Sequence, residues 1–108
     1  MDNNRLDVKP VQLPASLSAS SAADFKQLLV SRINEKGNIP LDGGKVESAD
    51  SCGMQMLLCF IMTRKYQDEG VRWVDCSETL YHAACLLGMR RLVGLAGSLV
   101  EELILGMD

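Results

Sequence analysis

The stretch LDGGKVESADSCGMQMLLCF, residues 41–60, decides the fold of this chain. It begins inside a short apolar run, 39–42, that predicts a strand, and the two glycines at 43–44 predict a turn or bulge after it. Asp50 and Ser51 are residue types that cap a helix. The apolar residues that follow are three and four positions apart, which predicts an amphipathic helix: Met54, Leu57, Leu58, Ile61 and Met62.

Strands and helices alternate along the rest of the chain at a similar spacing. The predicted elements, in chain order, are an edge strand within 6–13 that Pro10 interrupts, a helix over 21–35, the strand 39–42, an extended piece around Val46, a helix over 51–68, a strand over 71–75, a helix over 77–88 and an amphipathic piece over 96–105. Such alternation is typical of a largely parallel sheet. We therefore predict one domain over 1–108, an α/β sandwich with a mostly parallel sheet of four or five strands and helices packed mainly on one face.

Two of these elements have a predicted buried face. Strict alternation in the strand 71–75 places Val71, Trp73 and Asp75 on one face, with Trp73 under a helix. Helical spacing after Ser77 places three residues on the inner face of the next helix: Leu80, Ala84 and Leu87.

The charge of the chain argues against a nucleic-acid partner. The formal net charge is −3, whereas binding to nucleic acid needs a concentrated basic face. The densest basic groups are two pairs, Arg64 with Lys65 and Arg90 with Arg91, without interleaved aromatic residues. We interpret both pairs as solvated helix ends or partner contacts.

The four cysteines and the single histidine, His82, do not follow a metal-ligand pattern. No two cysteines are spaced C-x-x-C, which argues against a zinc site or a thioredoxin-like centre. Three of the four lie in apolar runs, and we interpret them as buried free thiols in a reducing cytoplasm. His82 is predicted at or near the surface. No catalytic set is visible in the sequence, so we expect neither an enzyme nor a cofactor.

The sequence also argues against targeting to a membrane. Residues 1–10 are polar and lack the apolar core of a secretory signal. The longest apolar stretch, 54–62, is far shorter than the ~20 residues that cross a bilayer. We therefore expect a cytoplasmic protein that does not insert into a membrane.

The order of residues around Asp50 resembles the core motif of STAS domains. In that family a strand ends in Asp, and a short turn, a hydrophobic residue and a second Asp follow. The second Asp opens a Ser/Thr-x-Gly loop at the start of a helix. The matching residues here are Asp42, Val46, Asp50 and the loop Ser51-Cys52-Gly53. Downstream, residues 70–74 resemble the family's glycine-then-strand element, and 77–92 resemble its following helix.

This resemblance, which covers about residues 10–95, implies a docking protein without chemistry of its own. Anti-sigma factor antagonists of the family act in bacterial signalling by switching between partners. The implied partner is an anti-sigma factor kinase, or a chemotaxis or two-component protein. It would bind the loop and the exposed side of the helix after it, at Asp50, Ser51, Cys52, Gly53, Met54 and Gln55. Met54 is expected at the partner surface because methionine adapts to binding grooves.

This chain differs from the family at the residue that is phosphorylated. In anti-sigma factor antagonists the kinase phosphorylates a serine just before the loop glycine, and here that position is Cys52. Ser51 keeps a hydroxyl one position earlier. Two interpretations of Ser51 stay open, a phosphoacceptor and a helix cap, and serine is a common helix cap.

A second branch of STAS domains offers an alternative function. Its loop reads Asp-Thr-small-small-hydrophobic-Gln before a Leu-rich helix, and Ser51 and Gln55 fall on its Thr and Gln. Relatives in this branch include the small cytoplasmic subunit of the ABC transporter that maintains outer-membrane lipid asymmetry. This resemblance implies an ABC ATPase as the partner, bound through the same loop.

Overall fold

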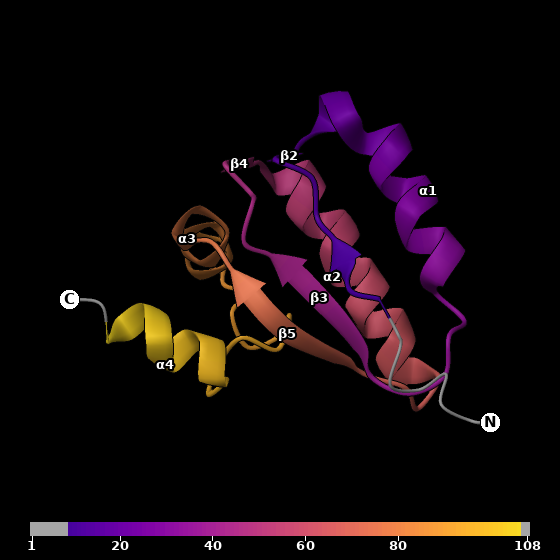
Figure 1. The fold of residues 1–108 in the computed structure, drawn as a ribbon. Helices are drawn as coiled ribbons and strands as arrows, with labels where there is room; N and C mark the ends of the chain where they lie inside the picture. The colour runs from indigo at the N-terminus through magenta and orange to yellow at the C-terminus, as the bar shows by residue number, and fades with distance from the viewer. Residues whose placement is uncertain (1–8, 107–108) are drawn as a thin grey trace.

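Strands and helices alternate in the structure, a computed structural model that describes residues 9–106 (Figure 1). The strands are β1 (Val11–Gln12), β2 (Ser16–Leu17), β3 (Ile39–Gly43), β4 (Ser48–Ala49) and β5 (Val71–Cys76). The helices are α1 (Ala22–Arg32), α2 (Ser51–Tyr66), α3 (Glu78–Leu86) and α4 (Leu99–Leu105), with a 3-10 turn, η2 (Ala19–Ser21), before α1. The α/β fold class is confirmed. Positions 6–8 of the predicted edge strand lie outside the described residues.

All strand pairs are parallel, but the strands form two sheets instead of one. The first sheet has the order β1-β3-β5, and the second pairs β2 with β4. The N–H of Leu13 still donates to the carbonyl of Asp42, at 2.9 Å. Two residues further on, the carbonyl of Ala15 accepts from the N–H groups of Glu47 and Ser48, at 2.7 and 3.1 Å, so the pairing passes from β3 to the segment of β4. The chain leaves the first sheet there, so the prediction of a single sheet of four or five strands is wrong.

Helices α1 and α2 lie side by side on one side of the larger sheet, and both begin at the end of the molecule where β2 and β4 lie (Figure 1). Helices α3 and α4 lie on the β5 side. Pro40 and Leu41 are both buried, and neighbouring residues of a strand point to opposite faces. Beside Pro40, however, Gln12 and Arg72 of the neighbouring strands are exposed on the same face, so the packing mainly on one face agrees with the prediction.

A bulge in β5 changes which of its residues are buried. Leu41 pairs with Trp73 and Asp42 pairs with Asp75, so Val74 has no partner across the ladder. The extra residue shifts the alternation, and Cys76 is buried while Asp75 is exposed. The predicted shared face of Trp73 and Asp75 is therefore wrong.

Trp73 is covered by the chain between α3 and α4. Its Nε1 donates to the carbonyl of Val93 at 2.8 Å, and its side chain is buried. The loop between α3 and α4 therefore contributes to the burial of this residue, and α4 also contacts β5. On α3, Leu80 and Ala84 are buried as predicted, but Leu87 is exposed, and Tyr81 takes up the remaining buried position.

Arg64 is fully buried, although the sequence predicted a solvated helix end. Its guanidinium donates to the carbonyl of Ile33 and to that of Gly70, each at 3.1 Å, and also to those of Glu35 and Gly37. Ile33 is the C-cap of α1, and Glu35 and Gly37 lie between α1 and β3. One side chain thus satisfies carbonyls from three segments that meet at the C-terminal end of α2.

Helix α4 is attached to the rest of the domain through the buried carboxylate of Glu101. This carboxylate accepts from the hydroxyl of Tyr81 and from the N–H of Gly97, both at 2.7 Å, and pairs with Arg90 at 3.2 Å. Arg90 is therefore partly buried in an ion pair instead of being a free surface cation. The predicted amphipathic piece is helical only from Leu99 onward.

Candidate functional site

Asp50 organises the loop that the sequence singled out. Its Oδ1 accepts from the N–H of Gly53 at 2.9 Å, which caps α2, and its Oδ2 accepts from the N–H of Ala19 at 3.2 Å. Its own N–H donates to the carbonyl of Leu17 at 2.9 Å. The hydrogen bonds from Gly53, and then from Ala19, lower the pKa of the Asp50 carboxyl below its usual value. Asp50 therefore joins the start of α2 to the loop before α1.

Substitution of Asp50 by asparagine is expected to reduce stability at neutral pH and to have less effect in acid. A lowered pKa means that folding favours the carboxylate, so its contribution is present above the usual value of 3.8 and is lost as the pH falls below it. The two oxygens of the carboxylate accept from the N–H groups of Gly53 and Ala19. An asparagine side chain has only one oxygen, so it cannot replace both acceptors. Urea unfolding midpoints of wild type and Asp50→Asn at pH 7 and at pH 3 measure this difference.

The control for this prediction is Asp24→Asn, which removes one exposed carboxylate from the first turn of α1. Its midpoint should differ little from wild type at pH 7. If the unfolding midpoints of wild type and Asp50→Asn differ as much at pH 3 as at pH 7, the result would contradict a role for the carboxylate charge.

The structure divides the six predicted binding residues into two groups. Four are exposed: Asp50, Ser51, Cys52 and Gln55. Gly53 and Met54 are buried, and Met54 has no exposed surface. The prediction that Met54 lies at the partner surface is wrong, because its position on the helix turns the side chain toward the core.

Gly53 is required by a close approach between α2 and β2. A Cβ at this position would lie 2.2 Å from the carbonyl oxygen of Leu17 and 2.3 Å from its carbonyl carbon. Both are backbone atoms, which cannot move aside as a side chain can. The glycine of the motif therefore lets the helix begin directly against β2, and its position fixes the direction in which Ser51 and Cys52 face solvent.

A serine-rich segment before α1 lies beside the candidate site. The hydroxyl of Ser18 lies 2.9 Å from that of Ser16 and 2.9 Å from that of Ser20. The hydrogen bond between Ala19 and Asp50 brings this segment next to the start of α2. We call the exposed residues at this end the loop surface: Ala19, Ser20, Asp50, Ser51, Cys52 and Gln55.

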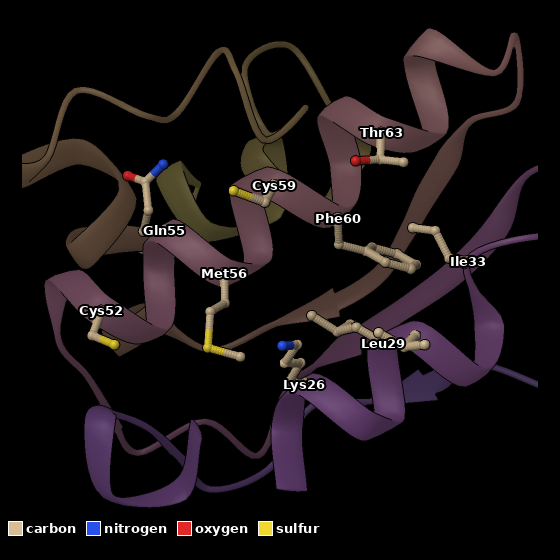
Figure 2. A pocket seen from close by; sticks show the side chains of 10 residues that line it. Lys26, Leu29, Ile33, Cys52, Gln55, Met56, Cys59, Phe60 and Thr63 are labelled. Carbon is tan, nitrogen blue, oxygen red and sulfur yellow. The ribbon is translucent and has the colours of Figure 1, made fainter. Parts of the chain in front are cut away.

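A groove of about 620 Å³ runs between α1 and α2 (Figure 2). Its lining comes from both helices: Lys26, Leu29, Val30, Ile33, Cys52, Gln55, Met56, Cys59, Phe60 and Thr63. In Figure 2 the side chains of Leu29 and Lys26 reach toward α2, and those of Met56 and Phe60 reach toward α1. The sequence analysis missed this groove, and the only sequence signal was the presence of apolar residues such as Val30 outside the buried stripe of α1.

The cysteines are more exposed than the sequence predicted. Cys76 is buried, and burial raises the pKa of its thiol to about 12. Cys52, Cys59 and Cys85 are exposed. Cys52 and Cys59 line the groove, whereas Cys85 lies on α3, outside it. His82 is exposed, as predicted.

Asp42 does not act together with Asp50. Its carboxylate accepts from the N–H of Gly44 at 3.0 Å and from the side chain of Gln12 at 2.6 Å. It therefore supports the turn after β3, which agrees with its predicted role at a strand end. Within residues 9–106, no group of three or more His, Cys, Asp or Glu side chains is placed to hold a metal ion.

Comparisons with protein-family models, with curated proteins and with solved structures give no match. In the part of the chain that the structure describes, every helix is too short or too polar to span a bilayer. The chemistry of the loop surface is therefore the main guide to function. It presents hydroxyls, a thiol, a carboxamide and a carboxylate that is already hydrogen-bonded to two backbone N–H groups.

Proposed function

We propose that this chain is a non-enzymatic docking domain of bacterial signalling in the cytoplasm, which binds a protein partner through the loop surface. The observation that carries the proposal is the turn from Asp50 to Gly53. Its hydrogen bonds and its contact with Leu17 hold Ser51 and Cys52 exposed at the first turn of α2. The resemblance of this motif to STAS domains supplies the class of function, that of the anti-sigma factor antagonists.

A partner would find this surface already ordered. The backbone of the loop is fixed at both ends by Asp50, through Gly53 on one side and Ala19 on the other. Because less chain has to be ordered on binding, such a surface loses less conformational entropy than a mobile loop does. The exposed hydroxyl and carboxamide of Ser51 and Gln55 would then give specificity by hydrogen bonding.

Phosphorylation at Ser51 would switch such an interface off. A phosphoryl group adds about −1.5 to −2 charges at neutral pH, and here it would lie next to the carboxylate of Asp50. Repulsion and the desolvation of this charge would disfavour the docked state. The family's own phosphoserine position is occupied by Cys52, so Ser51 is the hydroxyl that carries this part of the proposal.

The test is recovery of partners on the tagged protein from its native cells, with wild type compared to Ser51→Glu by quantitative mass spectrometry. Ser51→Glu is expected to lose the signalling partner, a kinase-like, sigma-related or chemotaxis protein, by about tenfold or more. Thr79→Glu is the matched control, because Thr79 is also exposed in the first turn of a helix, α3, away from the loop surface. Equal recovery on both variants would contradict docking at Ser51.

A mass measurement separates docking from the phosphorylation switch. Incubation with the recovered kinase and ATP should add the mass of one phosphoryl group to wild type and none to Ser51→Ala. If a kinase binds the loop surface without adding this mass, the result would agree with docking and contradict the phosphorylation switch.

The presence of Cys52 at the phosphoserine position favours a second candidate function. A permanent subunit does not need a phosphorylation cycle, and the loop also resembles the STAS branch that serves lipid-transport ABC complexes. Recovery of an ABC ATPase and its permease in the same experiment would assign the chain to such a complex.

A further inference from the structure

The α1–α2 groove is an apolar surface that shares only Cys52 and Gln55 with the loop surface. Val30 lines it and is 60% exposed, next to Leu29 and Ile33. Met56 and Phe60 form the opposite wall. Ile33 and Met56 are partly buried, and Leu29 and Phe60 are buried. Apolar side chains that line an open groove are typical of a binding site. The volume of about 620 Å³ lies within the usual range for sites that hold small organic molecules.

The polar groups of the groove are few and carry one sign of charge. Among the ten lining residues, Lys26 is the one charged side chain, and Gln55 and Thr63 supply the other hydrogen-bonding groups besides the two thiols. A protein segment would need a polar rim with many hydrogen-bond partners. A long apolar chain with a single anionic group fits this lining better.

The position of the cation gives the site a direction. Lys26 lies in the first half of α1, beside Met56 and Leu29, with Cys52 beyond it toward the start of α2, whereas Ile33 and Thr63 mark the other end (Figure 2). Both helices begin at the Lys26 end, so the positive ends of their dipoles add to its charge. Two carboxylates lie at this end too, those of Asp24 in the first turn of α1 and of Asp50 before α2. Neither residue lines the groove, and Asp50 is hydrogen-bonded to Gly53 and Ala19.

We propose that the α1–α2 groove binds a single-chain amphiphile with an anionic headgroup. The headgroup, a carboxylate or a phosphate, pairs with Lys26, and the apolar chain lies between Leu29 and Phe60 toward Ile33. This site adjoins the loop surface at Cys52 and Gln55, but neither proposal depends on the other.

The test uses the four cysteines of the chain as reporters. Cys52 and Cys59 line the groove, Cys85 is exposed elsewhere, and Cys76 is buried. Labelling rates with a maleimide are measured for each cysteine by peptide mass spectrometry, with and without dodecanoate below its micelle concentration. At four times the Kd, the rates at Cys52 and Cys59 should fall about fivefold, while the rate at Cys85 stays unchanged.

The headgroup is tested with amphiphiles of equal chain length. Dodecyl phosphate should protect Cys52 and Cys59 as dodecanoate does, while dodecanol and dodecylamine should protect them much less. The ratio between dodecanoate and dodecyl phosphate shows which anion is preferred. Protection by dodecylamine or dodecanol equal to that by dodecanoate would overturn the anionic class of ligand.

Two variants locate the site. Val30→Asp places a carboxylate on the groove wall at an exposed position and should abolish protection, whereas Leu103→Asp, at an exposed position of α4, should not. Lys26→Glu should weaken dodecanoate about fivefold, and Lys65→Glu, exposed outside the groove, should not. Equal protection of Cys85, or unchanged protection in Val30→Asp, would overturn the assignment to this groove.

A second copy of the chain is the competing occupant, and the same labelling detects it. If two chains cover each other's grooves, Cys52 and Cys59 become protected without amphiphile as the protein concentration rises. That result would overturn the proposal, as would labelling rates that dodecanoate leaves unchanged.

Discussion

Replacing Arg64 by methionine is expected to lower the free energy of unfolding by about 3–5 kcal/mol. The guanidinium is fully buried and donates to four backbone carbonyls, those of Ile33, Glu35, Gly37 and Gly70. Methionine has a similar shape but has no donors, so these carbonyls would lose their partner in a buried site. A loss of this size is a large share of the stability of a domain of this length.

Urea unfolding followed by circular dichroism measures this loss, with Lys65→Met as the matched control. Lys65 is the next residue and is exposed, so its substitution should change the free energy of unfolding by less than about 0.5 kcal/mol. Arg64→Lys should recover only part of the loss, because an ammonium group lacks the planar fork that reaches several carbonyls. Equal stability of Arg64→Met and Lys65→Met would contradict the role of the guanidinium as the link between these segments.

The sequence predicts the type and order of the elements because these depend on local patterns. The capping residues Asp50 and Ser51 and the apolar spacing after them place the start of α2 close to Ser51, where the helix begins. Gly70 and the alternation after it place β5 almost as well. Such signals need only the residue itself and its neighbours within one or two turns.

The burial of Arg64 depends on contacts that no local pattern contains. Three of its partner carbonyls, at Ile33, Glu35 and Gly37, lie 31, 29 and 27 residues away in the chain. An arginine near a helix end is ordinarily solvated. Arg64 is buried because α1 packs beside α2 and brings these carbonyls to its guanidinium.

The split of the strands into two sheets is partly encoded in the sequence. Pro14 stands between β1 and β2, and a proline in an extended segment indicates an edge or a break. The bulge at Val74 has no comparable signal, because a strand of six residues with one extra residue still resembles an alternating strand. The burial of Cys76 in place of Asp75 follows from that bulge and could not be predicted without it.

The candidate site, too, could be predicted from the sequence only in part. Its location at 50–55 follows from the motif, and Ser51 and Cys52 are exposed as a docking loop requires. Met54 was expected at the partner surface because methionine adapts to binding grooves, but one turn of helix points its residues to different sides, and Met54 faces the core. The α1–α2 groove depends on the separation of two helices, which the sequence does not specify.

Gly53→Ala is expected to destabilise the domain by about 2–4 kcal/mol, although alanine normally favours a helix over glycine by about 0.5–1 kcal/mol. The added Cβ would lie 2.2 Å from the carbonyl oxygen of Leu17, a backbone atom of β2. Either β2 or the first turn of α2 must move to relieve this overlap. Movement of either one strains the hydrogen bonds that Asp50 makes to Leu17 and Ala19.

The stability of Gly53→Ala is again measured by urea unfolding. Cys52→Ala is the control, because Cys52 is the neighbouring exposed residue of the same turn. Its unfolding midpoint should stay close to that of wild type. The thiol of Cys52 supplies a second readout in Gly53→Ala, since displacement of the first turn of α2 should change its rate of labelling while that of Cys85 stays constant. A stabilised Gly53→Ala would mean that α2 does not begin against β2. In that case the contact that orients Ser51 toward solvent would be absent, and the loop surface would lose the rigid support on which the docking proposal depends.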